Sequence, residues 1–360
     1  MYTEKNVKEI RKEVFLFCKI IVYTSTFLSI LGLIIAIFLT HIKVESYFGC
    51  FYFGIYANRL TGVYLNSNVL GSISAVAIIC CHIVFKEEKR FRSFRKTLPL
   101  HIIITCFVFN SLSLLLSDSN NSFLFLIIYI TILVFCRLFI GGQKVRKKIL
   151  KKVALLLTFC FVFPFLSFIL RNFCQYGFNY IVSALHSHMI PVQDNKDLDF
   201  KEEIIGRKIS TDPTSGRIML IKQGIELFCK FPLVGVGGGS NIIDYSKKYL
   251  KDGLIYPDLH NGYLTILVSY GTIGFVIFFC FTIKVLAKIC KFLLMKYNKL
   301  QCCCFENLFA TIIAFGVYSL FETSMPAETI FIAGFFWLIL GYCIAHVYQK
   351  KKIKFEIIEF

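Results

Sequence analysis

The chain alternates long runs of apolar residues with short polar connectors. A helix needs about 20 apolar residues to cross the roughly 30 Å hydrocarbon core of a bilayer. Eight runs meet this requirement, at residues 20–40, 67–85, 98–117, 122–142, 153–171, 261–283, 305–324 and 329–348. The first run is too long for the apolar region of a cleavable signal peptide, so we expect it to stay in the protein. The pattern predicts an all-α polytopic membrane protein with about eight transmembrane helices.

The connectors between these runs alternate in charge. Most of the 40 Lys and Arg residues lie in the N-terminal segment, in alternate connectors and in the C-terminal tail. The opposite short connectors, at 41–66, 117–121 and 324–328, contain only Lys43 and Arg59. An excess of Lys and Arg marks cytoplasmic loops. We therefore expect both termini in the cytoplasm and an even number of crossings.

One connector is much longer than the others and divides the chain into segments. We expect an N-terminal membrane bundle of about five helices at 1–170 and an extracytoplasmic loop at 171–259, between the fifth and sixth helices. The C-terminal membrane helices follow at 260–348, and a basic cytoplasmic tail at 349–360. Within the loop, residues 217–231 form an amphipathic pattern. Such a helix fits either a position at the membrane interface or ordinary packing against protein.

Composition excludes several other classes of protein. Hydrophobic residues make up 56% of the chain and charged residues 17%, with a mean hydropathy of +0.68. The net charge of +18 does not indicate a nucleic-acid partner, because the basic residues come in short bursts between apolar runs. Most of the 15 cysteines lie within apolar runs, where a thiol behaves as a small apolar side chain. No cysteine spacing predicts a metal site.

The end of the long loop is rich in glycine. The segment 232–241 contains Gly235, Gly237, Gly238 and Gly239, which allow backbone amides to approach an anion closely. A flexible connector is the alternative interpretation. No Gly-Lys-Ser/Thr follows the glycines, so the segment is not a nucleotide-binding P-loop.

His260 and Asn261 stand where the loop returns to the membrane. A histidine here titrates near neutral pH and is suited to take a proton from a sugar hydroxyl. A histidine that only bonds backbone at the interface is the alternative. Glu322 lies inside the predicted span 305–324, and an acid within a membrane helix is a candidate functional residue. Its simplest alternative role is pairing with an arginine.

Two arginines on the predicted outer face complete the candidate site. They are Arg59, in the first outer connector, and Arg217, at the start of the amphipathic pattern. The guanidinium group presents a planar fork of donors that matches two phosphate oxygens and stays charged at any working pH. The pair therefore predicts binding of a phosphate-bearing group.

Four stretches together resemble the bacterial family of O-antigen ligases and Wzy-type polysaccharide polymerases. They are RLTGVYLNSNVLG at 59–71, LLLSDSNNSFLFL at 114–126, SGRIMLIKQGIELFCKFPLVGVGGGSN at 215–241 and HNGYLTILVSYGTIG at 260–274. The histidine-asparagine start of the last stretch and its later glycines are the most specific match. In the second stretch, Asn120 replaces an arginine that the family usually has, which removes one expected cation.

The resemblance implies glycan transfer from a polyprenyl-pyrophosphate carrier on the outer face of the bacterial cytoplasmic (inner) membrane, without metal or other cofactor. It implies that Arg59 and Arg217 hold the pyrophosphate and that His260 acts on the acceptor hydroxyl. The expected substrate-binding residues are Asn66, Asn68, Gly235, Gly237, Gly239, Asn261 and Glu322. The expected partners are the lipid-linked glycan donor, a glycan or lipid acceptor, membrane lipid and a chain-length regulator, with no nucleic acid.

Three functions fit these features. The first is a polymerase that joins lipid-linked repeat units, and the second is a ligase that transfers finished glycan to a lipid or other envelope acceptor. The third is a transporter or flippase that moves a lipid-linked sugar without chemistry. That last function expects charged or broken helices near the membrane midplane and inverted repeats, and the sequence indicates little of either.

Overall fold

The computed structural model describes most of the chain, and its residues group into two compact units. The described residues are 7–38, 42–46, 49–64, 66–90, 99–140, 149–189, 204–206, 216–251, 253–254, 259–295, 299–323 and 330–356. The first unit comprises 1–11, 128–142 and 209–360, and the second comprises 12–127 and 143–208. These units group residues by contact in space, whereas the predicted segments divide the chain along its sequence.

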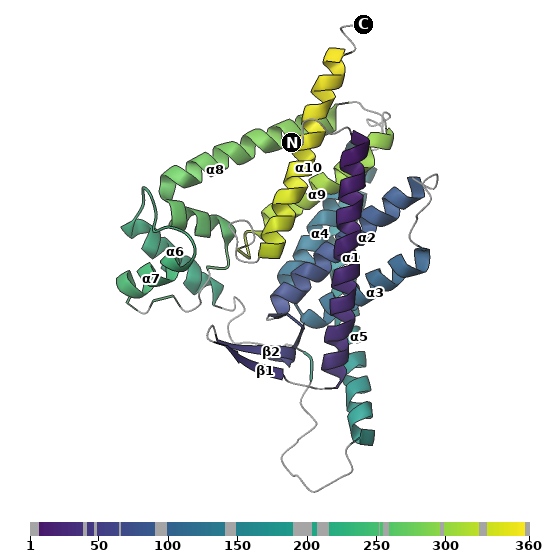
Figure 1. Cartoon of the computed structure of the whole chain (residues 1–360), viewed down its shortest axis with the longest axis vertical. Helices are drawn as coiled ribbons and strands as arrows, with labels where there is room; N and C mark the ends of the chain where they lie inside the picture. The colour runs from purple at the N-terminus through teal and green to yellow at the C-terminus, as the bar shows by residue number, and fades with distance from the viewer. Residues whose placement is uncertain are drawn as a thin grey trace. The chain divides into compact units, whose positions relative to one another are not determined.

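Helices dominate the described residues (Figure 1). They are α1 (Val7–Ile37), α2 (Ser67–Arg90), α3 (Leu100–Ser117), α4 (Asn120–Phe135), α5 (Ile149–Met189), α6 (Arg217–Lys230), α7 (Ser240–Tyr249), α8 (Gly262–Leu294), α9 (Lys299–Tyr318) and α10 (Ile330–Glu356), with a π-helical turn η1 (Cys136–Ile140) after α4. Seven helices of the described chain are long and apolar enough to cross a membrane. The predicted class, an all-α polytopic membrane protein, is confirmed.

The seventh predicted span, 305–324, corresponds to a shorter apolar stretch. Within α9 the apolar part is Phe305–Tyr318, and the helix ends at Tyr318 rather than at residue 324. The chain then tightens into a turn, because the amides of Leu320 and Phe321 bond to carbonyls three residues earlier. The whole of α9 has 20 residues, a length of about 30 Å. It is therefore long enough to cross a bilayer although its apolar part is short.

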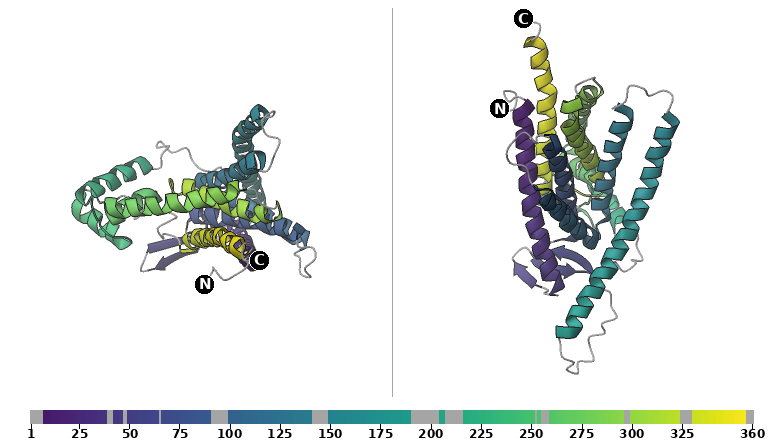
Figure 2. Two further views of the ribbon diagram at one scale, coloured as in Figure 1. Left: turned by 90° about the horizontal axis from the view of Figure 1, so that it is seen from above. Right: turned by 90° about the vertical axis from the view of Figure 1, so that its right-hand side faces the viewer.

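The fifth predicted span was expected to end at residue 171, and this boundary is wrong. Helix α5 continues to Met189, and its candidate membrane segment runs from Val153 to Leu185; Figure 2 shows it as one long helix. Arg171 interrupts the apolar run in the sequence but forms an ion pair with Asp118 inside the second unit. A paired charge does not end a helix, so the long loop begins later than predicted.

A small sheet replaces part of the first outer connector, where no strand was predicted. Strands β1 (Ile42–Ser46), β2 (Gly49–Tyr56) and β3 (Arg59–Gly62) form an antiparallel sheet in the order β1-β2-β3. β2 and β3 are joined by a tight turn in which Ala57 and Asn58 both have positive φ. This geometry is typical of a two-residue hairpin.

One face of the sheet contributes to the core of the second unit. The buried side chains come from α1, β2, β3, α2, α3, α5 and the segment 204–206, and are Leu33, Ala36, Ile55, Leu60, Leu70, Leu116, Phe178, Val182 and Ile205. The backbone of α1 approaches β3 closely at Gly32, where an added Cβ would lie 2.8 Å from the Cα of Gly62. The sheet therefore packs onto the ends of these helices and fixes the position of Arg59.

Candidate functional site

Three of the predicted residues meet in the first unit. Arg217 Nη2 lies 3.2 Å from Glu322 Oε1, and His260 Nδ1 lies 3.1 Å from Glu322 Oε2. The Glu322 side chain is only 12% exposed, against 30% for Arg217 and 27% for His260. One shielded carboxylate therefore holds a guanidinium and an imidazole, both of which remain partly open to solvent or substrate.

Each member of this Arg217–Glu322–His260 cluster comes from the end of a helix. Arg217 is the first residue of α6, and His260 precedes α8 by two residues with a left-handed φ of +48°. The interpretation of Glu322 as an acid within a helix is wrong, since it lies in the turn that follows α9. Only tertiary structure brings these three helix ends together, because 105 residues separate Arg217 from Glu322 along the chain.

Asn261 has a structural role beside the cluster. It is the N-cap of α8, and its side-chain oxygen accepts a hydrogen bond from the Leu264 amide at 3.0 Å. The next amide, of Gly262, donates to the Ser319 carbonyl at 2.8 Å. The first bond caps α8, and the second ties the start of α8 to the turn that carries Glu322. Asn261 thus positions His260, while its predicted substrate contact stays a prediction.

Substitution of Asn261 separates capping from substrate binding. Asn261→Ala is expected to lower the free energy of unfolding by about 1 kcal/mol, the usual effect of losing an N-cap. Asn261→Asp keeps an acceptor at the cap and is expected to unfold at the wild-type temperature. Thermal unfolding of the purified variants in detergent measures both effects. Equal unfolding temperatures for Asn261→Ala and the wild type would contradict the capping role.

The predicted glycine segment lies against a break in α8. Gly271 interrupts the helix with a φ of +64° and a ψ of −170°. In a continuous helix the amides of Thr272 and Ile273 bond to the carbonyls of Val268 and Ser269, four residues earlier. The break at Gly271 frees these two amides and two carbonyls, which need other partners in an apolar environment.

The segment after α6 supplies all four partners. The bonds run from Val236 N to Val268 O (3.0 Å), Gly237 N to Ser269 O (2.8 Å), Thr272 N to Pro232 O (2.8 Å) and Ile273 N to Leu233 O (3.2 Å). We call residues 232–237 the splice loop, because it replaces the broken helical bonds one for one. The amide of Gly237 is thus engaged with a carbonyl, and the amide of Gly235 donates to Phe231 O at 3.1 Å.

Close approach explains why glycines occupy the splice loop. A Cβ added at Gly235 would lie 2.5 Å from the carbonyl of Ser269, and one added at Gly271 would lie 2.3 Å from Leu233 O. Gly239 has a φ of +67° and open space around its Cα. Gly235 and Gly271 therefore have a packing function, and the predicted anion contact of Gly235, Gly237 and Gly239 stays a prediction.

Arg59 lies in the second unit and holds the end of a helix. Its Nε donates to the Ser117 carbonyl at 2.9 Å, and its Nη2 donates to the carbonyl of Asp118 at 3.1 Å. Both carbonyls are at the C-terminal end of α3, where a cation is favourable. Nη2 also donates to Asn68 Oδ1 at 2.8 Å. These contacts account for Arg59 as a cap, and its pyrophosphate contact stays a prediction.

Asn66 and Asn68 both organise the start of α2. Asn66 precedes the helix, and its Oδ1 accepts a hydrogen bond from the amide of Asn68 at 2.8 Å. This is the geometry of an N-cap. Asn68 then reaches Arg59, so the two asparagines link α2 to the α3–α4 junction.

Burial raises the pKa of the Tyr64 phenol to about 12, and this side chain stays neutral at physiological pH.

Arg171 is a candidate residue that the sequence analysis missed. Its Nη1 lies 2.7 Å from Asp118 Oδ1 and donates to Asn120 Oδ1 at 2.7 Å. Helix α5 therefore brings a cation to the side chain of Asn120, the position where an arginine was expected and found missing. No local pattern marks Arg171, because its partners are more than 50 residues away in the sequence.

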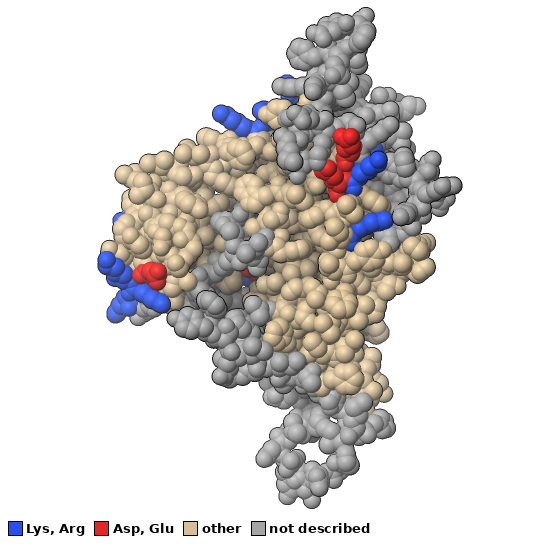
Figure 3. Space-filling model, in the orientation of Figure 1, with Lys and Arg blue, Asp and Glu red and all other residues tan. Residues whose placement is uncertain are grey.

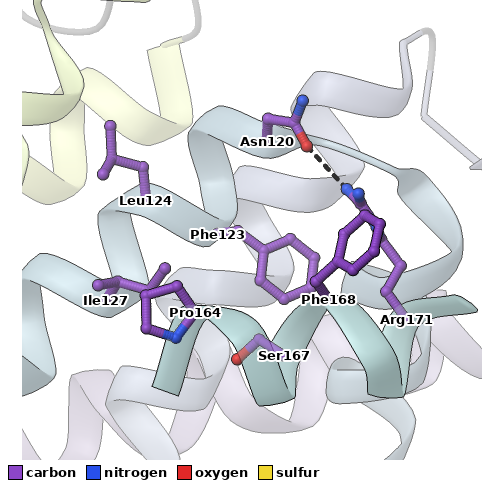
Figure 4. Close-up of a pocket in the computed structure, with 8 residues that line it drawn as sticks. All are labelled: Asn120, Phe123, Leu124, Ile127, Pro164, Ser167, Phe168 and Arg171. Carbon is purple, nitrogen blue, oxygen red and sulfur yellow. Dashed lines mark hydrogen bonds between the residues drawn. The ribbon is translucent and has the colours of Figure 1, made fainter. Parts of the chain in front are cut away.

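The contact of Arg171 with Asn120 closes one end of a cavity between α4 and α5 (Figure 4). The cavity has a volume of about 260 Å³ and is lined by Asn120, Phe123, Leu124, Ile127, Pro164, Ser167, Phe168 and Arg171. The guanidinium carbon of Arg171 lies 5.3 Å from the centre of the Phe168 ring, a cation–π distance. The cavity is thus mainly apolar with one polar end.

Comparison with known proteins adds a family match. The family model described as O-antigen ligase matches residues 105–279. This range includes Arg171, Arg217 and His260, and it excludes Arg59 and Glu322. No curated protein and no solved structure matches the chain.

Proposed function

We propose that this chain, whose residues 105–279 match the family model described as O-antigen ligase, is a polysaccharide polymerase. Its donor is a repeat unit linked to polyprenyl pyrophosphate, and it acts on the outer face of the bacterial cytoplasmic membrane. The family supports the broader class, a membrane enzyme of the O-antigen ligase and polymerase type. The donor and the choice of polymerase over ligase belong to the proposal.

One observation carries the proposal. Arg217 and His260 bond to the two oxygens of the same carboxylate, Glu322. Glycan transfer from a pyrophosphate needs a cation where negative charge develops and a base where a hydroxyl loses its proton. The cluster holds one of each on the two oxygens of Glu322, near helix ends rather than inside the spans.

The reaction forms one bond and breaks one. The acceptor hydroxyl oxygen attacks the anomeric carbon of the donor glycan, and the bond from that carbon to the pyrophosphate oxygen breaks. The leaving polyprenyl pyrophosphate takes the bonding electron pair, and Arg217 stabilises the added negative charge. His260 accepts the hydroxyl proton on Nε2, because donation from Nδ1 to Glu322 fixes the tautomer in which Nε2 has a lone pair. Glu322 stabilises the resulting imidazolium.

The transporter alternative has one feature in its favour, since α8 is broken at Gly271. Discontinuous helices are typical of transporters, whose half-helix ends bind substrate. Here the splice loop occupies the four freed backbone groups, so they do not offer a substrate site. The break therefore does not favour transport over transfer.

Product analysis distinguishes the three functions. The purified chain in vesicles is supplied with a polyprenyl-pyrophosphate-linked oligosaccharide. A polymerase is expected to give a ladder spaced by one repeat unit, with one polyprenyl pyrophosphate released for each bond formed. Transfer of a single glycan to a different lipid acceptor would identify a ligase. Movement of intact donor across the bilayer without a new glycosidic bond would contradict the enzymatic proposal.

A further inference from the structure

Part of the exposed surface of the α6–splice loop region is apolar. Helix α6 already buries one face, through Leu220, Gly224 and Leu227. A second side exposes Ile218, Ile221 and Ile225, which lie together because they are spaced by three and four residues. A third side exposes charged residues spaced by four, Lys222, Glu226 and Lys230. The helix therefore has an exposed apolar stripe beside a charged one.

The splice loop continues this exposed apolar surface. Leu233 is 65% exposed and Val234 is 72% exposed. Apolar side chains that cluster in this way mark a surface that contacts protein or lipid, whereas single exposed apolar residues are ordinary. Both side chains stand at the tip of a turn whose backbone is held rigidly by the bonds to α8.

Two features identify lipid as the partner. The first is continuity with a membrane helix, because the amide of Ile273 bonds to Leu233 O, and α8 then exposes Ile273, Val276 and Ile277. The tip of the splice loop thus lies beside apolar residues of a candidate span. Any partner that covers Leu233 would also contact these exposed side chains of α8. Because α8 is a candidate membrane span, the partner along it is lipid.

The second feature is the backbone pairing. Irregular backbone is tolerated at membrane depth only where its polar groups have protein partners. The splice loop satisfies the four groups that the break at Gly271 frees, and it uses its own amides and carbonyls to do so. A turn in water has no need of this pairing, since water would satisfy the same groups.

Helices α6 and α7 and the splice loop form a region that we call the α6–α7 lobe, and charged side chains gather on its α7 part. Helix α7 carries exposed Lys247 and Lys248 with Asp244, and Figure 3 shows charged side chains gathered over α7 at the left edge of the view. Tyr245 and Tyr249 stack beside them, with ring centres 5.6 Å apart. Lysine and tyrosine are typical of the membrane–water interface. The α6–α7 lobe therefore exposes an apolar stripe on α6 and the splice loop, and charged side chains on α7 and on another side of α6.

We propose that the Leu233–Val234 turn and the exposed apolar stripe of α6 insert into the outer leaflet of the bilayer, so that the α6–α7 lobe is anchored by a lipid wedge. The wedge would hold the start of α6, where Arg217 stands, at the level of the lipid headgroups. Lipid insertion goes beyond the proposed function and does not depend on it, because a non-catalytic protein with this surface would insert in the same way.

Tryptophan fluorescence tests the wedge. The chain has a single tryptophan, Trp337, so Trp337→Phe gives a silent background. Leu233→Trp in this background, in phosphatidylcholine vesicles, is expected to show blue-shifted emission that brominated acyl chains quench and aqueous acrylamide does not. Val234→Trp repeats the measurement in case Leu233→Trp lowers the yield of folded protein.

Lys247→Trp is the matched control, because this exposed residue of the same lobe lies on α7. Its emission is expected to be quenched by acrylamide and little affected by brominated lipid. Acrylamide quenching of a tryptophan at 233 or 234 to the level of the control would overturn the wedge. Protection from both quenchers would also overturn it, since that result indicates a protein partner such as a second copy of the chain.

Discussion

Replacing His260 by alanine is expected to reduce the rate of glycan transfer by about 10²- to 10⁴-fold, the usual contribution of a positioned general base. The residual rate reflects the orientation of two membrane-held substrates, which the substitution leaves intact. The readout is the rate of polymer formation by the purified variant from a lipid-linked repeat unit. Unfolding temperature is measured in parallel, because Glu322 loses one of its two partners in this variant.

His101→Ala is the matched control, since His101 is an exposed histidine of α3 outside the cluster. It is expected to polymerise at the wild-type rate. If His260→Ala makes polymer as fast as His101→Ala, with equal amounts of folded protein, His260 is not the base. A pH profile adds a second readout: a base gives a rate that falls as the imidazole is protonated, and this dependence should disappear in His260→Ala.

Most of the fold could be predicted because each membrane helix needs a long apolar run, which is evident in the sequence. The runs at 67–85 and 98–117 match the candidate spans Ser67–Lys86 in α2 and Leu100–Ser117 in α3 to within one or two residues. The predicted boundaries were wrong where a residue makes a tertiary contact that the sequence does not show. Arg171 appeared to end a span, but its ion pair with Asp118 allows α5 to continue. The sheet was missed because its short strands lie between two spans and pack against helix ends.

The candidate site was only partly predictable for a related reason. Residue type identified Arg217 and His260, since a guanidinium and an imidazole beside a lipid phosphate have an evident chemistry. It offered pairing with an arginine as one role of Glu322 but did not show that Arg217 and His260 are the partners, because a turn after α9 and the N-terminal end of α8 must first be bonded together. Arg171 was overlooked since its role depends on partners distant in the sequence. Sequence patterns report local periodicity well and pairings between distant segments poorly.

The glycine motif shows the same limit and leads to the second large effect. Gly235 and Gly237 belong to a predicted anion-binding pattern, yet in the structure they lie in the loop that pairs with the break at Gly271. Gly235 and Gly271 have a stricter steric requirement than a flexible connector, because backbone atoms rather than mobile side chains lie next to them. Substitution at Gly271 should therefore disrupt folding, whereas a connector would tolerate it.

Gly271→Ala is expected to be severely destabilising. The added Cβ would lie 2.3 Å from Leu233 O, and the residue would keep a φ of +64°. Backbone strain costs about 1–3 kcal/mol, and overpacking costs about 1–3 kcal/mol more. The sum, about 2–6 kcal/mol, is a large fraction of the roughly 5–15 kcal/mol that stabilises a typical domain. We expect little folded protein after extraction in detergent, and any folded fraction should unfold well below the wild-type temperature.

Two matched variants separate the causes. Gly239→Ala has a positive φ but open space, so it tests strain alone, and Gly334→Ala in α10 has open space without a positive φ. Gly334→Ala is expected to be neutral or slightly stabilising, because alanine favours a helix. The expected order of unfolding temperatures is Gly334→Ala highest, then Gly239→Ala, then Gly271→Ala. If Gly271→Ala is as stable as Gly239→Ala, the splice loop does not pack closely against the break in α8. The backbone of the Leu233–Val234 turn would then not be held by α8 as the wedge proposal assumes.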